Sequence, residues 1–571
     1  MAYQITKLCA KCHSCRMECP VSAIHFKGIH YVIDPNKCTE CGHCIEICPV
    51  CAIINDKKPE TIEPHERLRK NCDLVVAGGG GSGMVAAVKY AQLTGGKVIV
   101  LEKAKKIGGS TNLAHGFGAI YSKWQQDAGD PDVREQIVQN SLKKSGGLLD
   151  EAMIRKIIYS TGEFFDWLCS FGGAEEAFSL VDSSVGPQDA SAIKGTSRIG
   201  FPERKFANLK CEDQAVGPGW MGTYVIRKMQ EQCAALDIEI LTGCAAEKLL
   251  TNEASAVSGV LARDAGGEVE ITCDAVILAT GCCSYNDEMV RKIEPRFFDV
   301  DLVRQSVPTC TGDGITMAES VGGFIDYENI RVAMAQPAHH PFGYSGYRYL
   351  QQPQTVIVNL NGKRYANESA PPMGANATAF LDQPKGYAYA VIDDALVETY
   401  SAKLIANPPD ESEGWILKKY RQEIEEDSQN EIAILIGDTI EDLDREFNRV
   451  WGTPIGALAE ELHRYNHFCE IGIDEDFGKD PRFLVPLKTG PFYAFYAQGF
   501  SEGTYGGIVT DTDMQVLTKS GEKIPGLYAA GDNAQGFNHR ALRGPDIAPV
   551  SDLTWAMNSG YQAAISVAER K

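Results

Sequence analysis

The sequence predicts a multidomain protein of the α/β class, and three observations lead to that prediction. The chain has 571 residues, which is too long for a single hydrophobic core. Eight of its 19 cysteines fall in two regular clusters within the first 48 residues. A short apolar strand, a glycine-rich turn and an alanine-rich helix then follow one another between residues 73 and 93, as in a dinucleotide-binding fold.

Composition and charge limit the classes of function. Hydrophobic residues make up 44% and charged residues 23% of the chain, which is typical of a soluble globular protein and excludes a disordered one. The formal net charge is −21 and no long run of lysine and arginine occurs, so binding to nucleic acid or to an anionic membrane is disfavoured. There is neither an apolar leader nor an apolar run of about 20 residues, and we expect a cytoplasmic protein with no membrane span.

The amino-terminal cysteines repeat one spacing, C-x2-C-x2-C-x3-C-P. This is the pattern of bacterial ferredoxins with two [4Fe–4S] clusters, in which the fourth cysteine of each run binds the other cluster. Cys48 should therefore complete the first cluster and Cys19 the second. Two zinc sites are the alternative, but zinc gives no reason for the third closely spaced cysteine and the trailing proline. The candidate metal ligands are Cys9, Cys12, Cys15, Cys19, Cys38, Cys41, Cys44 and Cys48.

The glycine-rich turn at residues 78–83 has the G-x-G-x-x-G spacing between a strand and a helix. Its glycines let a pyrophosphate approach backbone amides at the amino terminus of the helix, where the helix dipole favours negative charge. A second apolar strand ends at Glu102, 24 residues after Gly78. An acidic side chain there is placed to bind a ribose hydroxyl and to repel a 2′-phosphate. FAD and NAD therefore fit this site, and NADP does not.

Further motifs extend through most of the remaining chain, beginning with Gly-Gly-Ser-Thr-Asn at 108–112. In combination they resemble flavoproteins of the fumarate reductase and succinate dehydrogenase superfamily. The resemblance implies an α/β FAD-binding Rossmann-like domain with an inserted α+β capping domain, preceded here by a small α+β two-cluster ferredoxin domain. The matching motifs are VILATG at 276–281, TGDG at 311–314, NGKRYANE at 361–368, GTYGG at 503–507 and GLYAAGD at 526–532.

The resemblance implies that the cofactor is FAD, in addition to the two [4Fe–4S] clusters. Membrane-bound relatives attach FAD through a histidine just after the Gly-Gly pair, whereas here Ser110 stands there and His115 comes later, so we predict non-covalent FAD. Only one dinucleotide fingerprint is present, and we expect electrons to arrive through the clusters from an external donor such as a ferredoxin or another redox protein. The candidate FAD-binding residues are Gly78, Gly80, Gly81, Ser82, Gly83, Glu102, Lys103, Gly109, Ser110, Thr111, His115, Gly116, Thr280, Gly281, Asp313, Asp532, Pro549 and Val550.

The order of the motifs predicts five segments. They are a ferredoxin domain at 1–60, a polar linker at 61–71, the first part of the FAD domain at 72–333, the capping domain at 334–500 and the second part of the FAD domain at 501–571. By the resemblance, the substrate would bind between the cap and the flavin.

The substrate anchors of fumarate reductases are only half matched. His340 before Pro341 resembles the His-Pro of the cap, and Arg543 resembles the arginine after the AAG-E/D motif. The arginine expected soon after Asn-Glu is absent, since Glu368 is followed by Ser-Ala-Pro-Pro-Met, and Gly503 stands where a histidine is expected before T-x-G-G. Because burying an unpaired anion costs several kcal/mol, a dicarboxylate such as fumarate is not the expected substrate.

These features predict a reductase of an activated carbon–carbon double bond in a small-molecule enoate or enone. Arg543 with His539 would stabilise negative charge on a conjugated carbonyl, and a side-chain acid would protonate the neighbouring carbon. Two alternatives stay open: dehydrogenation of a saturated ketone or steroid-like substrate in the reverse direction, and a non-catalytic electron-transfer subunit. The candidate catalytic residues are Arg543, His539, Arg540, Tyr505 and His340.

Overall fold

A computed structural model gives the fold of the protein. The described chain forms two compact units, each assembled from separated segments. Unit 1 contains Met1–Asp56, Pro295–Gln305 and Met334–Glu502, and unit 2 contains Lys57–Glu294, Ser306–Ala333 and Gly503–Lys571. The described residues are 3–12, 14–17, 19–28, 30–55, 64–114, 118–174, 178–182, 197–200, 221–339, 353–369, 378–399, 424–425, 428–536 and 552–570.

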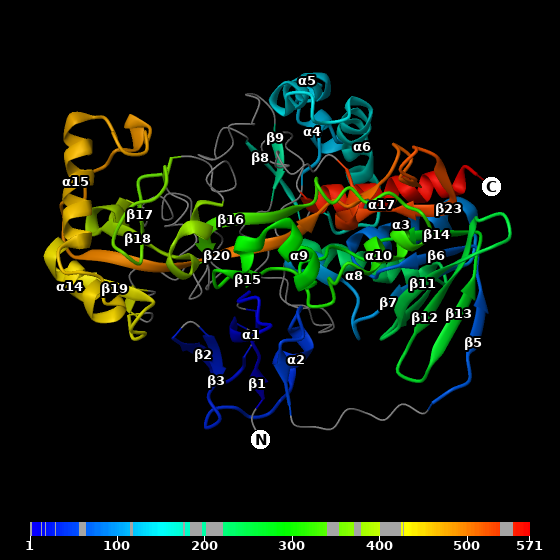
Figure 1. The fold of residues 1–571 in the computed structure, drawn as a ribbon, viewed down its shortest axis with the longest axis horizontal. Helices are drawn as coiled ribbons and strands as arrows, with labels where there is room; N and C mark the ends of the chain where they lie inside the picture. The colour runs from blue at the N-terminus through cyan, green and yellow to red at the C-terminus, as the bar shows by residue number, and fades with distance from the viewer. Residues whose placement is uncertain are drawn as a thin grey trace. The chain divides into compact units, whose positions relative to one another are not determined.

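The core of unit 2 is a six-stranded sheet with the order β10-β7-β6-β14-β23-β22. Figure 1 labels its strands β7, β6, β14 and β23. Neighbouring strands are parallel except for β22, which is antiparallel to β23. β6, β7 and β14 are buried along their whole length, as is typical of parallel strands covered on both faces. The strands are β6 (Leu74–Ala77), β7 (Val98–Glu102), β10 (Glu239–Thr242), β14 (Ala275–Leu278), β22 (Gln515–Leu517) and β23 (Lys523–Ala529).

Helices cover this sheet. Helix α3 (Gly81–Thr94) begins directly after β6 and packs against α17 (Asp552–Ala568) and α8 (Met221–Ala235) (Figure 1). The first eight residues of α3 are buried, because its small side chains allow close packing on both neighbours. Unit 2 also contains α4 (Lys123–Asp127), α5 (Arg134–Ser145), α6 (Glu151–Cys169), α9 (Asp287–Ile293), α10 (Asp313–Ser320), β21 (Ile508–Val509) paired with β24 (Ala534–Gln535), and β8 (Ser179–Asp182) paired with β9 (Ser197–Gly200).

A second sheet of unit 2 includes part of the predicted linker. Its order is β11-β12-β13-β5, with β11 (Ala245–Thr251), β12 (Val257–Arg263), β13 (Glu268–Thr272) and β5 (Leu68–Asn71). Residues 68–71, which we expected at the end of the linker, thus pair in parallel with β13. The sequence LRKN shows no apolar alternation, and charged contacts such as Arg67 Nη1 to Glu270 Oε2 at 3.0 Å hold the edge of the sheet instead.

The amino-terminal part of unit 1 is a small α+β arrangement. β1 pairs with β4 and β2 pairs with β3, both antiparallel. It contacts the remainder of unit 1, where Lys11 Nζ donates to Gln498 Oε1 and Asn430 Nδ2 donates to the carbonyl of Gly28 at 3.0 Å. The elements are β1 (Gln4–Ile5), α1 (Ser14–Met17), β2 (Ile24–Lys27), β3 (His30–Ile33), α2 (His43–Ile47) and β4 (Ile53–Ile54).

The rest of unit 1 is a mixed sheet with two long helices. The sheet has the order β15-β20-β18-β17, and β16 and β19 also pair with β20. Apolar residues of the sheet pack against α14 (Ile440–Trp451) and α15 (Ala457–Ile471) to form a separate core. The strands are β15 (Val303–Arg304), β16 (Arg331–His339), β17 (Val356–Asn359), β18 (Tyr387–Asp393), β19 (Ile434–Gly437) and β20 (Phe492–Tyr505). The first three residues of β16 and the last three of β20 belong to unit 2.

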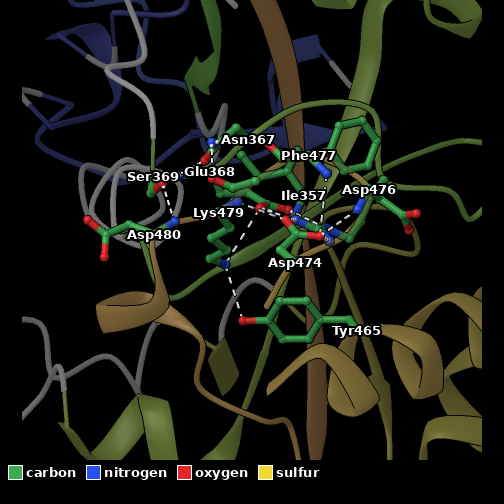
Figure 2. A network of polar contacts seen from close by, with 12 residues as sticks. Ile357, Asn367, Glu368, Ser369, Tyr465, Asp474, Asp476, Phe477, Lys479 and Asp480 are labelled. Atoms are coloured by element: carbon green, nitrogen blue, oxygen red, sulfur yellow. Dashed lines mark hydrogen bonds and ion pairs between the residues drawn. The ribbon is translucent and has the colours of Figure 1, made fainter. Parts of the chain in front are cut away.

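A buried network of charges holds the NGKRYANE segment of unit 1 (Figure 2). Arg364 donates to both carboxylate oxygens of Glu368 at 2.9 and 2.7 Å and to both of Asp474 at 3.1 and 2.9 Å. Lys479 Nζ lies 3.5 Å from Glu368 Oε2 and donates to the hydroxyl of Tyr465 at 3.2 Å. Two cations therefore balance two anions, and the network joins this segment to the loop after α15.

Candidate functional site

The carboxyl end of β6 runs into the predicted glycine turn. Gly78 has φ +119°, a conformation that glycine adopts without strain. A Cβ at Gly78 would lie 2.1 Å from the carbonyl oxygen of Ala279, and a Cβ at Gly83 would lie 1.9 Å from that of Gly78. Only glycine therefore allows this tight turn from β6 into α3, beside the carboxyl end of β14.

A second glycine-rich segment lies against the first. Gly80 and Gly108 form a parallel bridge, and the Gly81 N–H donates to Thr111 Oγ1 at 3.0 Å. The neighbouring Ser110 Oγ accepts a hydrogen bond from the Val307 N–H at 3.2 Å. Both predicted glycine motifs, including Gly109, are thus brought together at the amino terminus of α3.

Glu102 closes the same corner from the end of β7. Its carboxylate accepts hydrogen bonds from the backbone N–H groups of Gly79 at 2.9 Å and Ala104 at 2.7 Å. Burial raises the pKa of Glu102 above its usual value, although these two hydrogen bonds act in the opposite direction. The carboxylate thus joins the glycine turn to the strand end where we predict the ribose.

Two orphaned oxygens show that this corner fits FAD. Ser82 Oγ in the first turn of α3 and Asn533 Oδ1 in the turn after β23 are buried, and in the described part of the chain neither has a hydrogen-bond partner. A Cβ at Gly531 would lie 3.2 Å from Ser82 Oγ, so the two turns are adjacent. Since a buried oxygen without a partner costs on the order of 1–3 kcal/mol, a ligand with phosphate and hydroxyl groups would satisfy both. Ser82 would then hold the pyrophosphate, and the turn containing Asp532 and Asn533 would hold the ribityl side.

Lys103 and Asp313 lie together near this corner. Lys103 Nζ is 2.6 Å from Asp313 Oδ2 and donates to Thr311 Oγ1 at 2.6 Å, while Thr311 donates to Asp313 Oδ1 at 2.7 Å. The next residue, Gly314, donates its N–H to Thr280 Oγ1 at 3.0 Å. Thr280 is followed by Gly281, which has φ +73°. Three of the predicted FAD residues, Lys103, Thr280 and Asp313, therefore help to hold the loops after β7 and β14 to the start of α10.

Tyr505 is the candidate catalytic residue that lies within the described chain. It ends β20 and is buried, and the guanidinium of Arg331 lies 4.9 Å from the centre of its ring. Arg331 is buried too, and its Nη2 lies 3.6 Å from Asp552 Oδ1 at the start of α17. The next residue after Tyr505, Gly506, donates its N–H to the carbonyl of Asp532 at 3.0 Å. Tyr505 and Arg331 therefore lie beside the turn that we assign to the ribityl side.

Sequence reasoning missed Arg331. The sequence feature that could have identified this residue is a single positive charge at the start of an otherwise apolar run, Arg-Val-Ala-Met-Ala. A buried arginine is rare unless it is paired, and such a group in unit 2 is a candidate for contact with an anionic or polarised ligand. The other predicted site residues fall outside the described part of the chain: His115, Gly116, His340, His539, Arg540, Arg543, Pro549 and Val550.

The repeated cysteine spacing is matched by a repeated backbone conformation. Lys11 and Glu40, each two residues after the first cysteine of a run, have φ 52° and 56°. Ser22 and Cys51, each three residues after the fourth cysteine, have φ 48° and 51°. In both halves the N–H four residues after the fourth cysteine donates to its sulfur at 3.2 Å, and such N–H···S bonds tune cluster potentials. The two halves of the segment are thus built alike.

The thiols form two groups that cross between the runs. Burial, together with the nearby thiols of Cys12 and Cys48, raises the pKa of Cys9 to about 12. Burial likewise raises the pKa of Cys44 to about 11, and its neighbours are Cys41, Cys38 and Cys19. Iron binding would displace the protons that these free thiols carry. The fourth cysteine of each run therefore lies with the other run, as cross-ligation requires.

The eight cysteines are enough to supply four thiolates to each of two clusters. Among the residues that the structure describes, no three His, Cys, Asp or Glu side chains are close enough to share one metal ion. In a [4Fe–4S] cluster each thiolate binds a different iron, so the thiolates stand further apart. We expect the eight cysteines of residues 9–48 to supply all the ligands.

Comparison with known protein families identifies a domain for each of the two kinds of cofactor. The model of a family described as "FAD binding domain" matches residues 73–546. The chain belongs to this family. A second model, "4Fe-4S dicluster domain", matches residues 1–49. FAD and two [4Fe–4S] clusters are therefore the cofactors of this flavoprotein, as predicted.

Similar proteins support the same class. The flavoprotein is 26% identical to a fumarate reductase (cytochrome) of Shewanella frigidimarina, over 88% of this chain and 78% of that protein. It is 26% identical to a vinyl phenol reductase of Lactiplantibacillus plantarum, over 87% of this chain and 96% of that protein. A crystal structure of 3-ketosteroid Δ1-dehydrogenase from Sterolibacterium denitrificans superposes with a TM-score of 0.64 at 18% identity, over 88% of this chain and 100% of that one.

These findings confirm several predictions. The α/β FAD-binding fold with an amino-terminal dicluster domain is confirmed, and the flavoprotein is a flavin-dependent oxidoreductase. No helix in the described ranges is long and apolar enough to cross a bilayer. The individual ligands, the five segment boundaries and non-covalent attachment of FAD stay predictions.

Proposed function

We propose that the flavoprotein reduces a carbon–carbon double bond conjugated to a carbonyl or carboxylate group. One observation supports this proposal above all. The chain combines a dicluster segment at 1–49 with a longer part that is related to a fumarate reductase and a vinyl phenol reductase. Both named substrates contain a carbon–carbon double bond. When bound, the clusters supply single-electron transfer and FAD supplies hydride transfer from its N5 atom. An external redox protein would supply the electrons.

The residues disfavour a dicarboxylate substrate. Gly503 has φ +138°, and a Cβ there would lie 3.1 Å from the sulfur of Cys282. A histidine, which the fumarate reductase pattern has at this position, would therefore meet that thiol. Glu368 is paired with Arg364 and Lys479. The arginine that the fumarate reductase pattern has soon after this glutamate is absent here. An enoate with one carboxylate, or an uncharged enone, needs fewer cationic partners than a dicarboxylate. Either substrate is therefore consistent with this smaller set of cations.

Tyr505 is the described residue that we assign to proton transfer. Its ring is buried against Arg331, whose positive charge favours negative charge developing nearby. Arg331 would fix the position of the ring, and Asp552 would hold Arg331. Arg543, His539, Arg540 and His340 keep their proposed roles in binding the conjugated carbonyl and in proton transfer.

An anaerobic screen tests the proposal. Reduced viologen would be mixed with the holoenzyme and with unsaturated acids, enones and steroids, and dye oxidation would be followed together with product identity. We expect turnover with at least one enone or monocarboxylic enoate and little with fumarate. No turnover with any alkene, or faster oxidation of the saturated products with oxidised dye, would overturn the assignment.

A pair of tyrosine variants tests the residue assignment. Tyr505→Phe should lower kcat by about a hundredfold or more while the flavin content stays normal, because general-acid groups contribute roughly 10²–10⁴-fold. Tyr528→Phe is the matched control, since this buried tyrosine lies on β23 in the same unit. Equal kcat values for both variants would remove Tyr505 from the mechanism.

A further inference from the structure

Three cysteines that the proposed reaction does not use gather in unit 2. Cys282, Cys283 and Cys310 are 1%, 0% and 4% exposed. Cys282 and Cys310 lie close together, although 27 residues separate them along the chain. A Cβ at Gly281, the residue before Cys282, would lie 3.5 Å from the sulfur of Cys310, and each thiol shifts the pKa of the other. Cys283 points elsewhere, because its sulfur lies 3.2 Å from Thr504 Oγ1. Two of the three thiols are thus paired, and the third is not part of the pair.

Backbone hydrogen bonds hold the two loops that carry the pair. The Gly312 N–H donates to the carbonyl of Cys282 at 3.3 Å, and the Tyr285 N–H donates to the carbonyl of Cys310 at 2.9 Å. Around the sulfur atoms, Ser284 Oγ lies 3.2 Å from Cys282 Sγ, and Ser110 Oγ lies 3.6 Å from Cys310 Sγ. The fold therefore holds the two loops, and with them Cys282 and Cys310, side by side.

The pair lies where the FAD-binding segments converge. Cys282 follows β14, the strand between β6 and β23, and parallel strands present their carboxyl ends at one edge of the sheet. Ser110, which contacts Cys310, belongs to the second glycine-rich segment. Asp532, in the turn assigned to the ribityl side, is close enough to raise the pKa of Cys310. The pair is therefore bounded by residues from three of the loops that we assign to FAD.

We propose that Cys282 and Cys310 are a redox-active dithiol that exchanges an electron pair with FAD. In the oxidation step the two S–H bonds break, one Sγ–Sγ bond forms, and two electrons and two protons pass to oxidised FAD. In the reverse step the disulfide takes two electrons and two protons from reduced FAD. The holoenzyme would thereby store one electron pair beyond those held by the flavin and the clusters.

The surroundings of the two thiols suit this exchange. The neighbouring thiol of Cys310 lowers the pKa of Cys282, and a thiolate is the form that reacts. The thiol of Cys282 in turn raises the pKa of Cys310, which would retain its proton until the disulfide forms. Because both sulfur atoms are buried, external thiols and oxidants have little access to them. The bound cofactor is then the redox group within reach.

Electron counting in the holoenzyme tests this inference without any substrate. Oxidised wild-type protein and the variants Cys282→Ser, Cys310→Ser and Cys283→Ser would be titrated anaerobically with dithionite, with flavin and cluster absorbance as readouts. We expect wild type and Cys283→Ser to take two more electrons per chain than Cys282→Ser and Cys310→Ser. Equal uptake by all four proteins would overturn the proposal.

Disulfide mapping in the wild-type holoenzyme gives a second readout. This readout does not depend on whether the variants fold. Samples poised at potentials across the flavin titration would be acid-quenched, alkylated and analysed by mass spectrometry. We expect a Cys282–Cys310 disulfide in the oxidised samples and two alkylated thiols in the reduced ones, with the change at potentials where the flavin is also titrating. Free thiols at every potential, or a disulfide that involves Cys283, would refute the pair. Neither experiment depends on the identity of the alkene substrate.

Discussion

Arg364 and Glu368 form a bidentate ion pair whose side chains are each 1% exposed. They are four residues apart, and Asp474 supplies a second buried carboxylate from the loop after α15. A buried charge without an ion-pair partner keeps its full desolvation cost. The stability of this part of unit 1 should therefore depend on every member of the network.

Removal of the arginine charge should destabilise unit 1. We expect Arg364→Met to lower the free energy of unfolding by about 3–5 kcal/mol, because buried Asp474 loses its guanidinium partner and Glu368 keeps only Lys479 as a cationic partner. Urea unfolding followed by tryptophan fluorescence would measure it, since Trp451 packs in this core. Arg296→Met is the control, because its exposed pair with Asp382 at 3.2 Å should contribute about 0–1 kcal/mol. Similar losses in both variants would contradict the assignment.

The same network predicts a pH dependence of stability. Burial raises the pKa of Glu368, but Lys479 and Arg364 outweigh it and hold this pKa below its usual value of 4.5. A carboxyl group with a lowered pKa stabilises the fold fully above its unfolded pKa of about 4.3, and that stability is lost as pH falls through the folded pKa. The urea midpoint of the wild type should therefore fall below about pH 4.3.

Glu368→Gln provides the comparison for this pH dependence. The variant should be less stable at pH 7, and its urea midpoint should fall less steeply in acid, because the amide does not titrate. Glu288→Gln is the control, since its exposed pair with Lys292 should leave the acid slope unchanged. If Glu368→Gln and the wild type had the same slope, other carboxyl groups would control acid stability.

Ser82→Ala should weaken FAD binding without harming the apoprotein. A hydrogen bond to a charged group is worth about 1.5–3 kcal/mol, so the affinity for FAD should fall roughly ten- to hundredfold. The thermal midpoint of the apoprotein should not fall, because Ser82 Oγ has no partner in the described chain to lose. Flavin titration and calorimetry measure the two effects. Ser141→Ala, which removes a buried hydrogen bond to the Ile137 carbonyl, should leave FAD affinity unchanged.

Cysteine variants test the crossed ligation of the clusters. Cys48→Ser and Cys19→Ser should each lower the iron content by about four atoms, which is one cluster. Adding Cys9→Ser to Cys48→Ser should cost no further iron, whereas adding Cys38→Ser should remove the second cluster, because the thiols of Cys9 and Cys48 lie in the same group. Iron analysis and electron paramagnetic resonance would measure these losses. Cys51→Ser, at an exposed cysteine beside the second run, is the control. The reverse pattern in the double variants would show that each run binds its own cluster.

Local patterns were sufficient to predict the cofactors. The glycine turn and the cysteine runs place their chemistry within a few residues, and the φ angles at Gly78, Lys11 and Glu40 show that the backbone conformation is local as well. Strand β5 is an element that local sequence patterns do not predict. Its four residues look like a polar linker, because an edge strand paired with a segment some 200 residues away needs no apolar alternation.

The sequence by itself determined which cofactors this flavoprotein binds, because thiolate spacing and a strand–glycine–helix turn act over short stretches of chain. Only the tertiary structure decided that Arg331 lies over Tyr505 and that the thiols of Cys282 and Cys310 meet. The physical reason is the order of the strands, which brings together segments from distant parts of the chain and buries them side by side. A buried charge or a paired thiol acquires its properties from those neighbours, and no local pattern records them.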